Sequence, residues 1–355
     1  MRPKEYRIKE LLREKGLDGA IVSSPENFHY VTGFGGHQHT VSRQPGFTLA
    51  VMRADDKVPT HLTTMDFEAA TFRIKAAGLN FVVDPYDTWV GLKTWDEIAH
   101  GAVVPDKTAM ESSMDKLVQF MKACDLANKK VGIELDYLPV PYYKSLTEKF
   151  PEAEFVNISD LFVYARSVKQ PDEIEMFRKL CRIADHGFTE VSKIAKIGVS
   201  ERELVQCFRE DVIKSGFCAP SSWSMFSTGP SSARLTLPGD GVVKDGDVVK
   251  FDAGVNAEFD FYTTDTSRAW IIGNGDPALL KLKDRLYEGQ RRMIAAAKPG
   301  LPINELYHTA YDYVKEMFPC YRRGHQGHSI SMGPATAEAP YINASETRPL
   351  EAGMI

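Results

Sequence analysis

One segment of the 355-residue sequence constrains the fold more than any other: DVVKFDAGVNAEFDFYTTDTSRAWIIG, residues 247–273. Two runs rich in apolar residues flank a turn-prone centre at 256–260, a pattern that predicts two antiparallel strands joined as a hairpin. Aspartate is depleted in strands, yet these strands carry Asp252 and Asp265. If the strands pair about the midpoint of the two aspartates, the carboxylates lie directly opposite each other on one face, with Cβ atoms about 5 Å apart.

Opposed carboxylates on a sheet need a compensating charge. Like charges directly opposite each other are unfavourable, and a buried carboxylate is costly without a cationic partner. A divalent transition metal between the aspartates, or a pair of such ions, would supply that charge and could activate water if a histidine lay nearby. The alternative is that both aspartates lie at solvated strand ends and bind nothing. The residues of the hairpin alone leave both interpretations open.

Composition narrows the class of protein. The sequence has 43 basic and 48 acidic side chains and a formal net charge of −5, with no cluster of lysine and arginine. It therefore lacks the basic patch expected of a protein that binds nucleic acid or an anionic membrane. Its five cysteines are scattered and never form a CxxC pair, which is typical of reduced thiols in a cytoplasm. The start of the chain is charged throughout, unlike a signal peptide. We expect a cytoplasmic protein with neither nucleic-acid nor membrane partners.

The pattern of elements predicts two domains, residues 1–163 and 164–355. In the first, strands alternate with helices, which is typical of a small α/β domain. The second opens with an amphipathic pattern over 165–196, predicted as one long helix with Pro171 in its first turn. Two further helices are predicted at 276–298 and 303–317, between strand-like segments. We therefore expect helices covering an antiparallel sheet in the second domain.

Four stretches of the sequence, in this order, resemble the motifs of one enzyme family. They are SSPENFHYVTGF, ARSVKQPDEIEMFRKLCRIAD, the hairpin with its FDAG and YTTDTSR, and RGHQGHSISMGPATAEAPYI with the later LEAGMI. Together they resemble the pita-bread metallohydrolases, in the branch of creatinase, prolidase and aminopeptidase P. The resemblance spans nearly the whole chain. It implies an α+β fold, in which a creatinase-like α/β domain precedes a pita-bread catalytic domain whose helices cover a curved antiparallel sheet.

The resemblance also implies a site. Asp252, Asp265 and His328 fall on metal-ligand positions of the family, and two divalent ions (manganese, cobalt, iron or zinc) would activate the water that attacks an amide carbonyl. His325 would hold a substrate carbonyl or carboxylate, although a structural role in its loop is an equal alternative. We expect Arg268 to pair with a buried carboxylate and so position the hairpin. The implied substrate is a small peptide cleaved next to proline, and the implied assembly is a homodimer.

Three departures from the family pattern qualify this expectation. The family has substrate-binding histidines where this chain has Thr236 and Ala337, and only the threonine can donate a hydrogen bond. Their replacement favours an alternative, a same-fold hydrolase or lyase acting on a small non-peptide metabolite. A third candidate is a metal-free pseudoenzyme that binds a ligand or partner. Two glutamate ligands of the family would fall beyond Ile355, so we expect the sequence to be truncated at its C-terminus.

Overall fold

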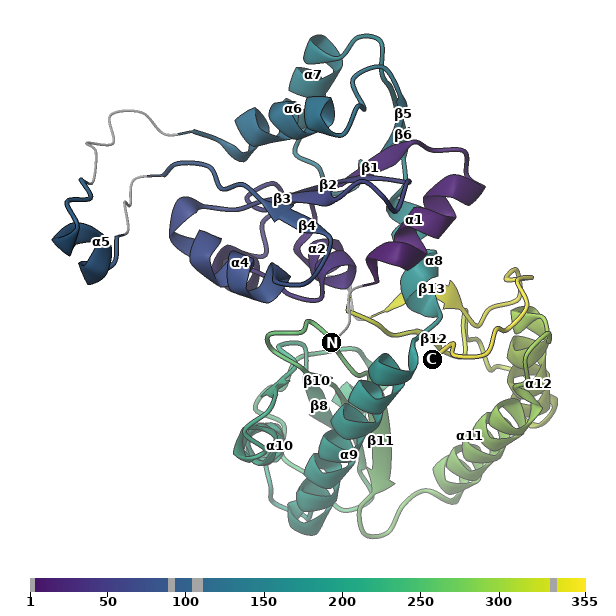
Figure 1. Cartoon of the computed structure of the whole chain (residues 1–355). Coiled ribbons are helices and arrows are strands. Elements are labelled where there is room, and N and C mark those ends of the chain that lie inside the picture. The colour runs from purple at the N-terminus through teal and green to yellow at the C-terminus, as the bar shows by residue number, and fades with distance from the viewer. Residues whose placement is uncertain (1–3, 89–92, 104–110, 333–336) are drawn as a thin grey trace. The chain divides into compact units, whose positions relative to one another are not determined.

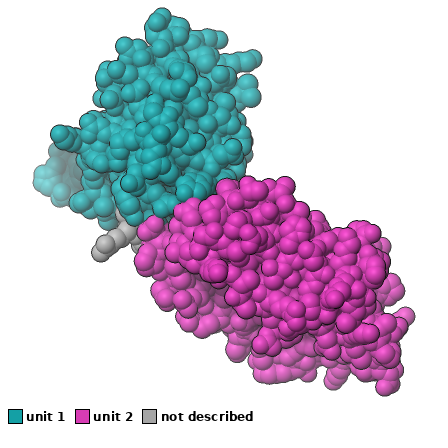
Figure 2. Space-filling view, turned by 90° about the vertical axis from the view of Figure 1, so that its right-hand side faces the viewer, with its two compact units in different colours: residues 1–165 teal, residues 166–355 magenta. Residues whose placement is uncertain are grey.

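The chain divides into two compact units, residues 1–165 and residues 166–355, drawn in two colours in Figure 2. The computed structural model describes residues 4–88, 93–103, 111–332 and 337–355. Each unit has its own sheets and helices (Figure 1) and is described by itself.

Unit 1 is built on one mixed sheet with helices around it. Its strands are β1 (Gly19–Val22), β2 (Leu49–Arg53), β3 (Thr60–Thr63), β4 (Phe81–Val83), β5 (Lys130–Ile133) and β6 (Glu154–Asn157). Its helices are α1 (Glu5–Glu14), α2 (Pro25–Thr32), α3 (His37–Ser42), α4 (Ala69–Ala76), α5 (Trp95–Ala99), α6 (Ser113–Ala123), α7 (Val140–Lys149) and most of α8 (Ser159–Ser167), with a 3-10 turn at Asp66–Glu68.

The sheet of unit 1 has six strands in the order β4-β3-β2-β1-β5-β6. The central strand β1 is antiparallel to β2 and parallel to β5. All four of its residues are buried, as expected for a strand covered on both faces. The predicted α/β character of the first domain is therefore present. The PENFHYVT stretch forms a two-turn helix that begins with Pro25 after the N-cap Ser24.

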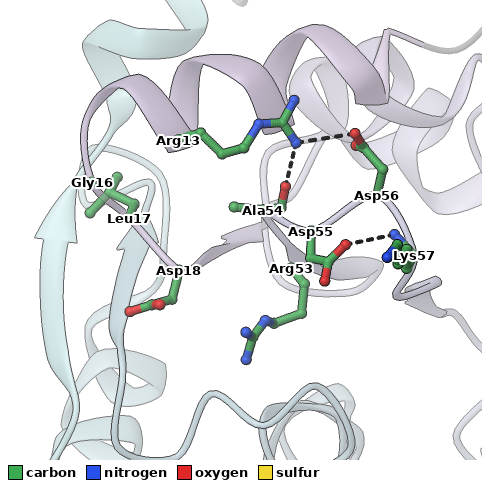
Figure 3. Close-up of a pocket in the computed structure, with 9 residues that line it drawn as sticks. All are labelled: Arg13, Gly16, Leu17, Asp18, Arg53, Ala54, Asp55, Asp56 and Lys57. Atoms are coloured by element: carbon green, nitrogen blue, oxygen red, sulfur yellow. Dashed lines mark hydrogen bonds and ion pairs between the residues drawn. The ribbon is translucent and has the colours of Figure 1, made fainter.

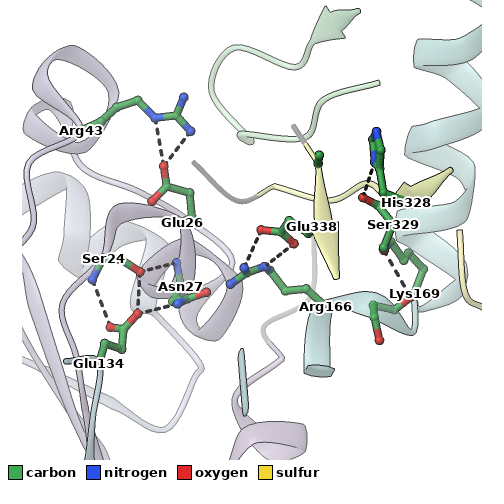
Figure 4. Close-up of polar contacts among 12 residues, drawn as sticks. Ser24, Glu26, Asn27, Arg43, Glu134, Arg166, Lys169, His328, Ser329 and Glu338 are labelled. Carbon is green, nitrogen blue, oxygen red and sulfur yellow. Dashed lines mark hydrogen bonds and ion pairs between the residues drawn. The ribbon is translucent and has the colours of Figure 1, made fainter. Parts of the chain in front are cut away.

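A fully buried carboxylate fastens α2 to this sheet. Glu134, directly after β5, is 0 % exposed. It accepts hydrogen bonds from the backbone N–H of Ser23 and Ser24 at 2.5 and 3.1 Å, from Ser24 Oγ at 2.7 Å and from Asn27 Nδ2 at 2.5 Å (Figure 4). These donors offset much of the cost of burying a charge. Glu134 thus ties the SSPEN turn to the parallel strand beside β1.

Unit 2 consists of small antiparallel sheets and four long helices. The helices are α9 (Pro171–Ile194), α10 (Glu201–Lys214), α11 (Pro277–Ala296) and α12 (Ile303–Met317), and a 3-10 turn covers Gly229–Ala233. The strands are β7 (Ala219–Pro220), β8 (Met225–Thr228), β9 (Val248–Ala253), β10 (Val255–Asn256), β11 (Thr266–Ile271), β12 (His328–Ser329) and β13 (Glu338–Tyr341). They pair as β11-β9-β8, β10-β7 and β12-β13.

An aromatic core joins the three-stranded sheet of unit 2 to two helices. Phe226 of β8 and Phe251 of β9 are paired residues, and their ring centroids lie 4.6 Å apart. Phe208 of α10 contacts the first ring and Phe188 of α9 stacks on the second. Because successive side chains of a strand point to opposite faces, Asp252 lies on the face turned away from these helices. The core therefore leaves that face available for a polar site.

The predicted long helix is confirmed as α9, which has Pro171 in its first turn as expected, but the first residues of the predicted range 165–196 belong to a separate helix. α8 ends at Ser167 and α9 begins at Pro171. The residue before a proline is disfavoured in the helical region, and Gln170 is accordingly extended, with ψ 162°. Residues 168–170 form a linker between the two helices, in which the backbone N–H of Lys169 donates to Gly353 O at 2.9 Å rather than to a helical carbonyl. The other two predicted helices are confirmed as α11 and α12.

None of the helices within the described part of the chain is long and apolar enough to cross a membrane.

Candidate metal centre

The aspartate hairpin forms, but in a different register from the predicted one. Asp252 of β9 lies opposite Ser267 of β11, not opposite Asp265. The same register continues beyond the strands, where Thr264 N donates to Val255 O. The connecting loop is residues 258–261, so the centre of the hairpin lies one residue further along the chain than the predicted midpoint. The predicted direct opposition of the carboxylates is therefore wrong, and they are diagonal neighbours on one face instead.

Gly254 fixes this register, because at this position the backbone segments on the two sides of the hairpin loop lie very close together. A Cβ at this position would overlap the carbonyl oxygen of Thr264 and lie 2.9 Å from the ring of Trp223. The glycine N–H also donates to Ser221 Oγ at 2.9 Å. Any larger residue would push the second arm away, so the spacing between Asp252 and Asp265 depends on a residue without a side chain.

The structure brings Asp252, Asp265 and His328 together. Burial raises the pKa of Asp252, and the Asp265 carboxylate raises it further through its charge and a side-chain hydrogen bond. His328 Nε2 lies 3.1 Å from Asp265 Oδ2, and this hydrogen bond is the main reason that the pKa of His328 is raised. The other ring nitrogen, Nδ1, donates to Ser329 O at 3.0 Å (Figure 4). The three side chains thus form one charged cluster.

His325 lies beside the cluster but does not bond to the aspartates. Its ring centroid is 6.0 Å from that of His328 and 5.7 Å from that of Tyr341. Burial lowers the pKa of His325, with smaller contributions from Arg323 and His328. The imidazole is therefore held neutral near pH 7, a form that can either donate or accept a hydrogen bond.

Two cations near the cluster were not predicted from the sequence. Lys250 and Arg323 both act on the charge of Asp252 and lower its pKa. Lys250 is two residues before Asp252 on the same strand, so the alternation of β9 could have placed it on the same face. Its Nζ donates to Arg234 O at 2.7 Å. No such signal points to Arg323, which lies in an irregular segment.

The expectation that Arg268 pairs with a buried carboxylate is wrong. Its guanidinium donates to Asp185 Oδ1 at 2.7 Å, but that carboxylate is 58 % exposed and Arg268 is 45 % exposed. By the register of the sheet, Arg268 lies opposite Phe251, on the face toward α9, and its guanidinium lies 5.6 Å from the ring of Phe188. Arg268 therefore fastens β11 to α9 at the surface, where an ion pair contributes little to stability.

The donor set suits a divalent transition metal but does not complete its coordination. Two carboxylates and an imidazole nitrogen are ligands that manganese, iron, cobalt and zinc all accept. The hydrogen bond from His328 Nδ1 to Ser329 leaves Nε2 as the metal-facing nitrogen, the usual arrangement for a ligating histidine. Within the described ranges, however, no group of three or more His, Cys, Asp or Glu side chains is arranged as a metal site. The cluster would need further ligands.

Two surface depressions lie away from the cluster. In unit 1, a depression of about 710 Å³ is lined by equal numbers of cationic and acidic side chains (Figure 3): Arg13, Arg53 and Lys57 against Asp18, Asp55 and Asp56. A second, of about 440 Å³, lies between α9 and α10 and is lined by Lys179, Arg182, His186 and Lys214 among others. Neither contains the aspartates of the hairpin, so neither competes with the cluster as the candidate centre.

Lys169, in the linker before α9, is an unusually buried cation close to this centre. It is 4 % exposed. Burial lowers its pKa to about 8, against the opposing influence of Glu173 and Glu338. Since the unfolded chain binds a proton at Lys169 up to pH 10.5 and the folded chain only up to about pH 8, stability from this residue rises with pH across that window.

This gives a prediction for Lys169→Met. The unfolding free energy of the wild type relative to that of the variant should rise by about 2–3 kcal/mol between pH 7 and pH 10. Urea titrations of both proteins at a series of pH values, with a chelator present, measure it. The comparison cancels the titration of other groups, including the Cys124 thiol, whose pKa burial raises to about 11. A pH-independent difference would show that Lys169 is not desolvated.

The two units and the carboxylate–histidine cluster define a class: a metallopeptidase-like hydrolase with a creatinase-type N-terminal domain. The model of metallopeptidase family M24 matches residues 175–355, and that of the creatinase/prolidase N-terminal domain matches residues 6–168. The chain belongs to metallopeptidase family M24. This confirms the expected family and fold class.

Several known proteins that are similar over nearly the whole chain are peptidases by name. The uncharacterized peptidase YqhT of Bacillus subtilis is 24 % identical over 98 % of this chain and 87 % of its own length. The Xaa-Pro dipeptidase of Bacillus anthracis superimposes with a TM-score of 0.78 at 23 % identity, over 98 % of this chain and 86 % of that chain. The prolidase of Pyrococcus furiosus gives 0.73 at 22 %, over 98 % and 89 %. At these identities the structural likeness establishes the fold.

Proposed function

We propose that this protein hydrolyses the amide bond next to proline in small peptides, with a pair of divalent ions bound at Asp252, Asp265 and His328. The observation that carries the proposal is the convergence of these three side chains, from two distant segments, on one face of the hairpin. Without a cation the two carboxylates repel each other, and the charge of Asp265 accordingly raises the pKa of Asp252. The relatives that bear a specific name, a dipeptidase and a prolidase, support the choice of substrate.

Each residue has a distinct role in this proposal. When bound, the ions would supply Lewis-acid activation of water and of the scissile carbonyl. Asp252 and Asp265 would bind the ions through their carboxylates, and His328 would bind through Nε2. The carbonyl of Ser329 fixes the imidazole ring by accepting the hydrogen of Nδ1. His325, neutral and beside Tyr341, is placed to hydrogen-bond a substrate carbonyl or carboxylate. Further ligands would complete the coordination.

Metal content is the first test. We expect about two manganese, cobalt, iron or zinc ions per chain by elemental analysis after reconstitution of a form in which the further ligands are present, and fewer in the 355-residue chain alone. The double variant Asp252→Asn/Asp265→Asn should retain none, because it removes both anionic donors. If no form of the protein holds metal, the peptidase proposal fails and a metal-free binding protein becomes the better interpretation.

Substrate choice separates the proposal from its runner-up. Thr236 directs its hydroxyl to Leu237 O at 3.2 Å, and Ala337 has no polar side-chain atom, so neither supplies the histidine contact of the usual peptidases. This favours, as the second candidate, hydrolysis or elimination of a small non-peptide metabolite. Cleavage of a panel of Xaa-Pro dipeptides by the metal-loaded protein would support the peptidase. A loaded protein inactive on every dipeptide would support the second candidate.

The assembly and cellular location are further proposals. We propose a cytoplasmic homodimer, in keeping with the scattered free cysteines Cys124, Cys181, Cys207, Cys218 and Cys320 and with the expectation from the family. Light scattering coupled to size-exclusion chromatography tests the dimer. A mass of one chain, 39.7 kDa, would rule it out.

A further inference from the structure

A buried polar network lies behind the candidate metal centre, where the start of α9 meets the two segments that carry the proposed ligands. Its members are almost inaccessible to solvent: Arg166 1 %, Lys169 4 %, Glu173 0 %, Tyr262 0 %, Ser329 5 % and Glu338 8 %. None of them belongs to the ligand set. Two cations and two carboxylates sequestered together are costly unless their geometry is good, so their presence calls for an explanation.

One branch of the network reaches the histidine. Lys169 Nζ donates to Ser329 Oγ at 3.2 Å and to Ser167 O at 3.3 Å (Figure 4). The carbonyl of Ser329 in turn accepts the Nδ1 hydrogen of His328 at 3.0 Å. Lys169 therefore anchors the residue that orients the imidazole ring. Nearby, Arg166 binds the carboxylate of Glu338 through Nη2 at 2.7 Å and Nε at 3.4 Å, which ties β13 to the end of α8.

The second branch reaches the hairpin. Tyr262 Oη donates to Glu173 Oε1 at 2.8 Å, and the ring of Tyr262 packs edge-on against Phe177 with centroids 5.5 Å apart. Tyr262 is three residues before Asp265, in the arm whose register Gly254 fixes. Glu173 is also the carboxylate that acts most strongly on the charge of Lys169. The two branches are therefore joined at the N-terminal end of α9.

We propose that Lys169 and Glu173 are positioning residues, which set the distance and orientation of His328 relative to Asp265 through Ser329 and Tyr262. The inference rests on the proposed metal function and deepens it. Ligand-orienting contacts of this kind affect metal affinity and coordination geometry, not only stability. The hairpin also contacts the histidine segment directly, through Thr263 N to Ser331 O at 3.0 Å, and the residues at the start of α9 bond to both segments.

The test compares cobalt binding in matched variants of the protein. Lys169→Met breaks the histidine branch and Tyr262→Phe breaks the hairpin branch by removing one hydroxyl. We expect the dissociation constant for Co²⁺, measured by titration of its visible absorption, to rise by about 10- to 100-fold in each. The absorption spectrum at saturation should also change, because the ligands no longer meet in the same geometry. Lys169→Arg, which keeps the charge and the donors, should recover part of the affinity.

The controls are a lysine and a tyrosine of equal burial in unit 1. Lys9 is 2 % exposed and donates to Val58 O at 3.2 Å, and Tyr86 is 4 % exposed and donates to Phe47 O at 2.9 Å. Lys9→Met and Tyr86→Phe should lower the unfolding midpoint without changing cobalt affinity or its spectrum. If Lys169→Met and Tyr262→Phe behave like these controls, the positioning role is overturned while the proposed function stands. If the wild type binds no cobalt, the proposed function itself fails, and this inference with it.

Discussion

Asp252→Asn is expected to reduce kcat/KM on a cleaved Xaa-Pro dipeptide by about 10³-fold or more, because several kcal/mol of charge stabilisation depend on the metal that this carboxylate helps to hold. In the metal-free protein, by contrast, the same change should increase thermal stability. There the carboxylate is half-buried next to Asp265, and burial and like charge both disfavour its ionised form. Removing it should raise the melting temperature of the chelator-treated protein.

The sign reversal makes this prediction specific. With saturating metal the wild type should melt at the higher temperature, since an ion that binds only the folded state stabilises it. With a chelator, the order should reverse. Asp240→Asn, at a carboxylate 90 % exposed and paired with Arg202, is the matched control and should change neither activity nor melting. An Asp252→Asn variant with activity within tenfold of wild type would show that Asp252 is not a ligand.

Glu134→Ala should cost unit 1 about 3–5 kcal/mol of unfolding free energy. The change would leave the buried backbone donors of Ser23 and Ser24 and the amide of Asn27 without their shared acceptor. Glu134→Gln should also destabilise, because its NH₂ group would face hydrogen-bond donors. Urea unfolding followed by circular dichroism measures both effects.

Glu154→Ala is the matched control for Glu134. Glu154 begins β6, the strand beside β5, but it is 64 % exposed and pairs with Lys130 at 3.0 Å. A change there should cost less than about 1 kcal/mol. If Glu134→Ala is equally mild, the donors must find water as a substitute, and the SSPEN turn does not depend on this carboxylate.

Elements with strong local signals were predictable from the sequence. The bounds of α11 and α12 follow from proline and glycine at their ends and from helical spacing. The start of α9 was predictable too, because Pro171 suits the first turn of a helix and restricts the residue before it. The pairing of β9 with β11 was foreseeable, but its register was not. The register depends on a four-residue loop in which Phe261 adopts φ 63°, a conformation that no sequence signal for phenylalanine indicates.

The candidate site was predictable only as a set of residues. Spacing within the motifs, read through the family resemblance, pointed to Asp252, Asp265 and His328, which the structure brings together. Their surroundings depend on contacts between distant segments, which periodicity does not encode. Lys169 illustrates this, because a lysine in a polar linker is normally exposed. Its burial follows from the packing of β12 and the Gly353 carbonyl around it.

The polar network also has a consequence for how unit 2 reaches its folded state. The bonds that satisfy the start of α9 close over long stretches of chain: 89 residues from Glu173 to Tyr262, 160 from Lys169 to Ser329 and 172 from Arg166 to Glu338. During synthesis, residues 166–173 leave the ribosome long before their partners exist. Because such non-local contacts form slowly, the nascent helix must keep its charges in water and its apolar side exposed meanwhile. Unit 2 should therefore complete this network late, once the segments that carry Ser329 and Glu338 have been synthesised.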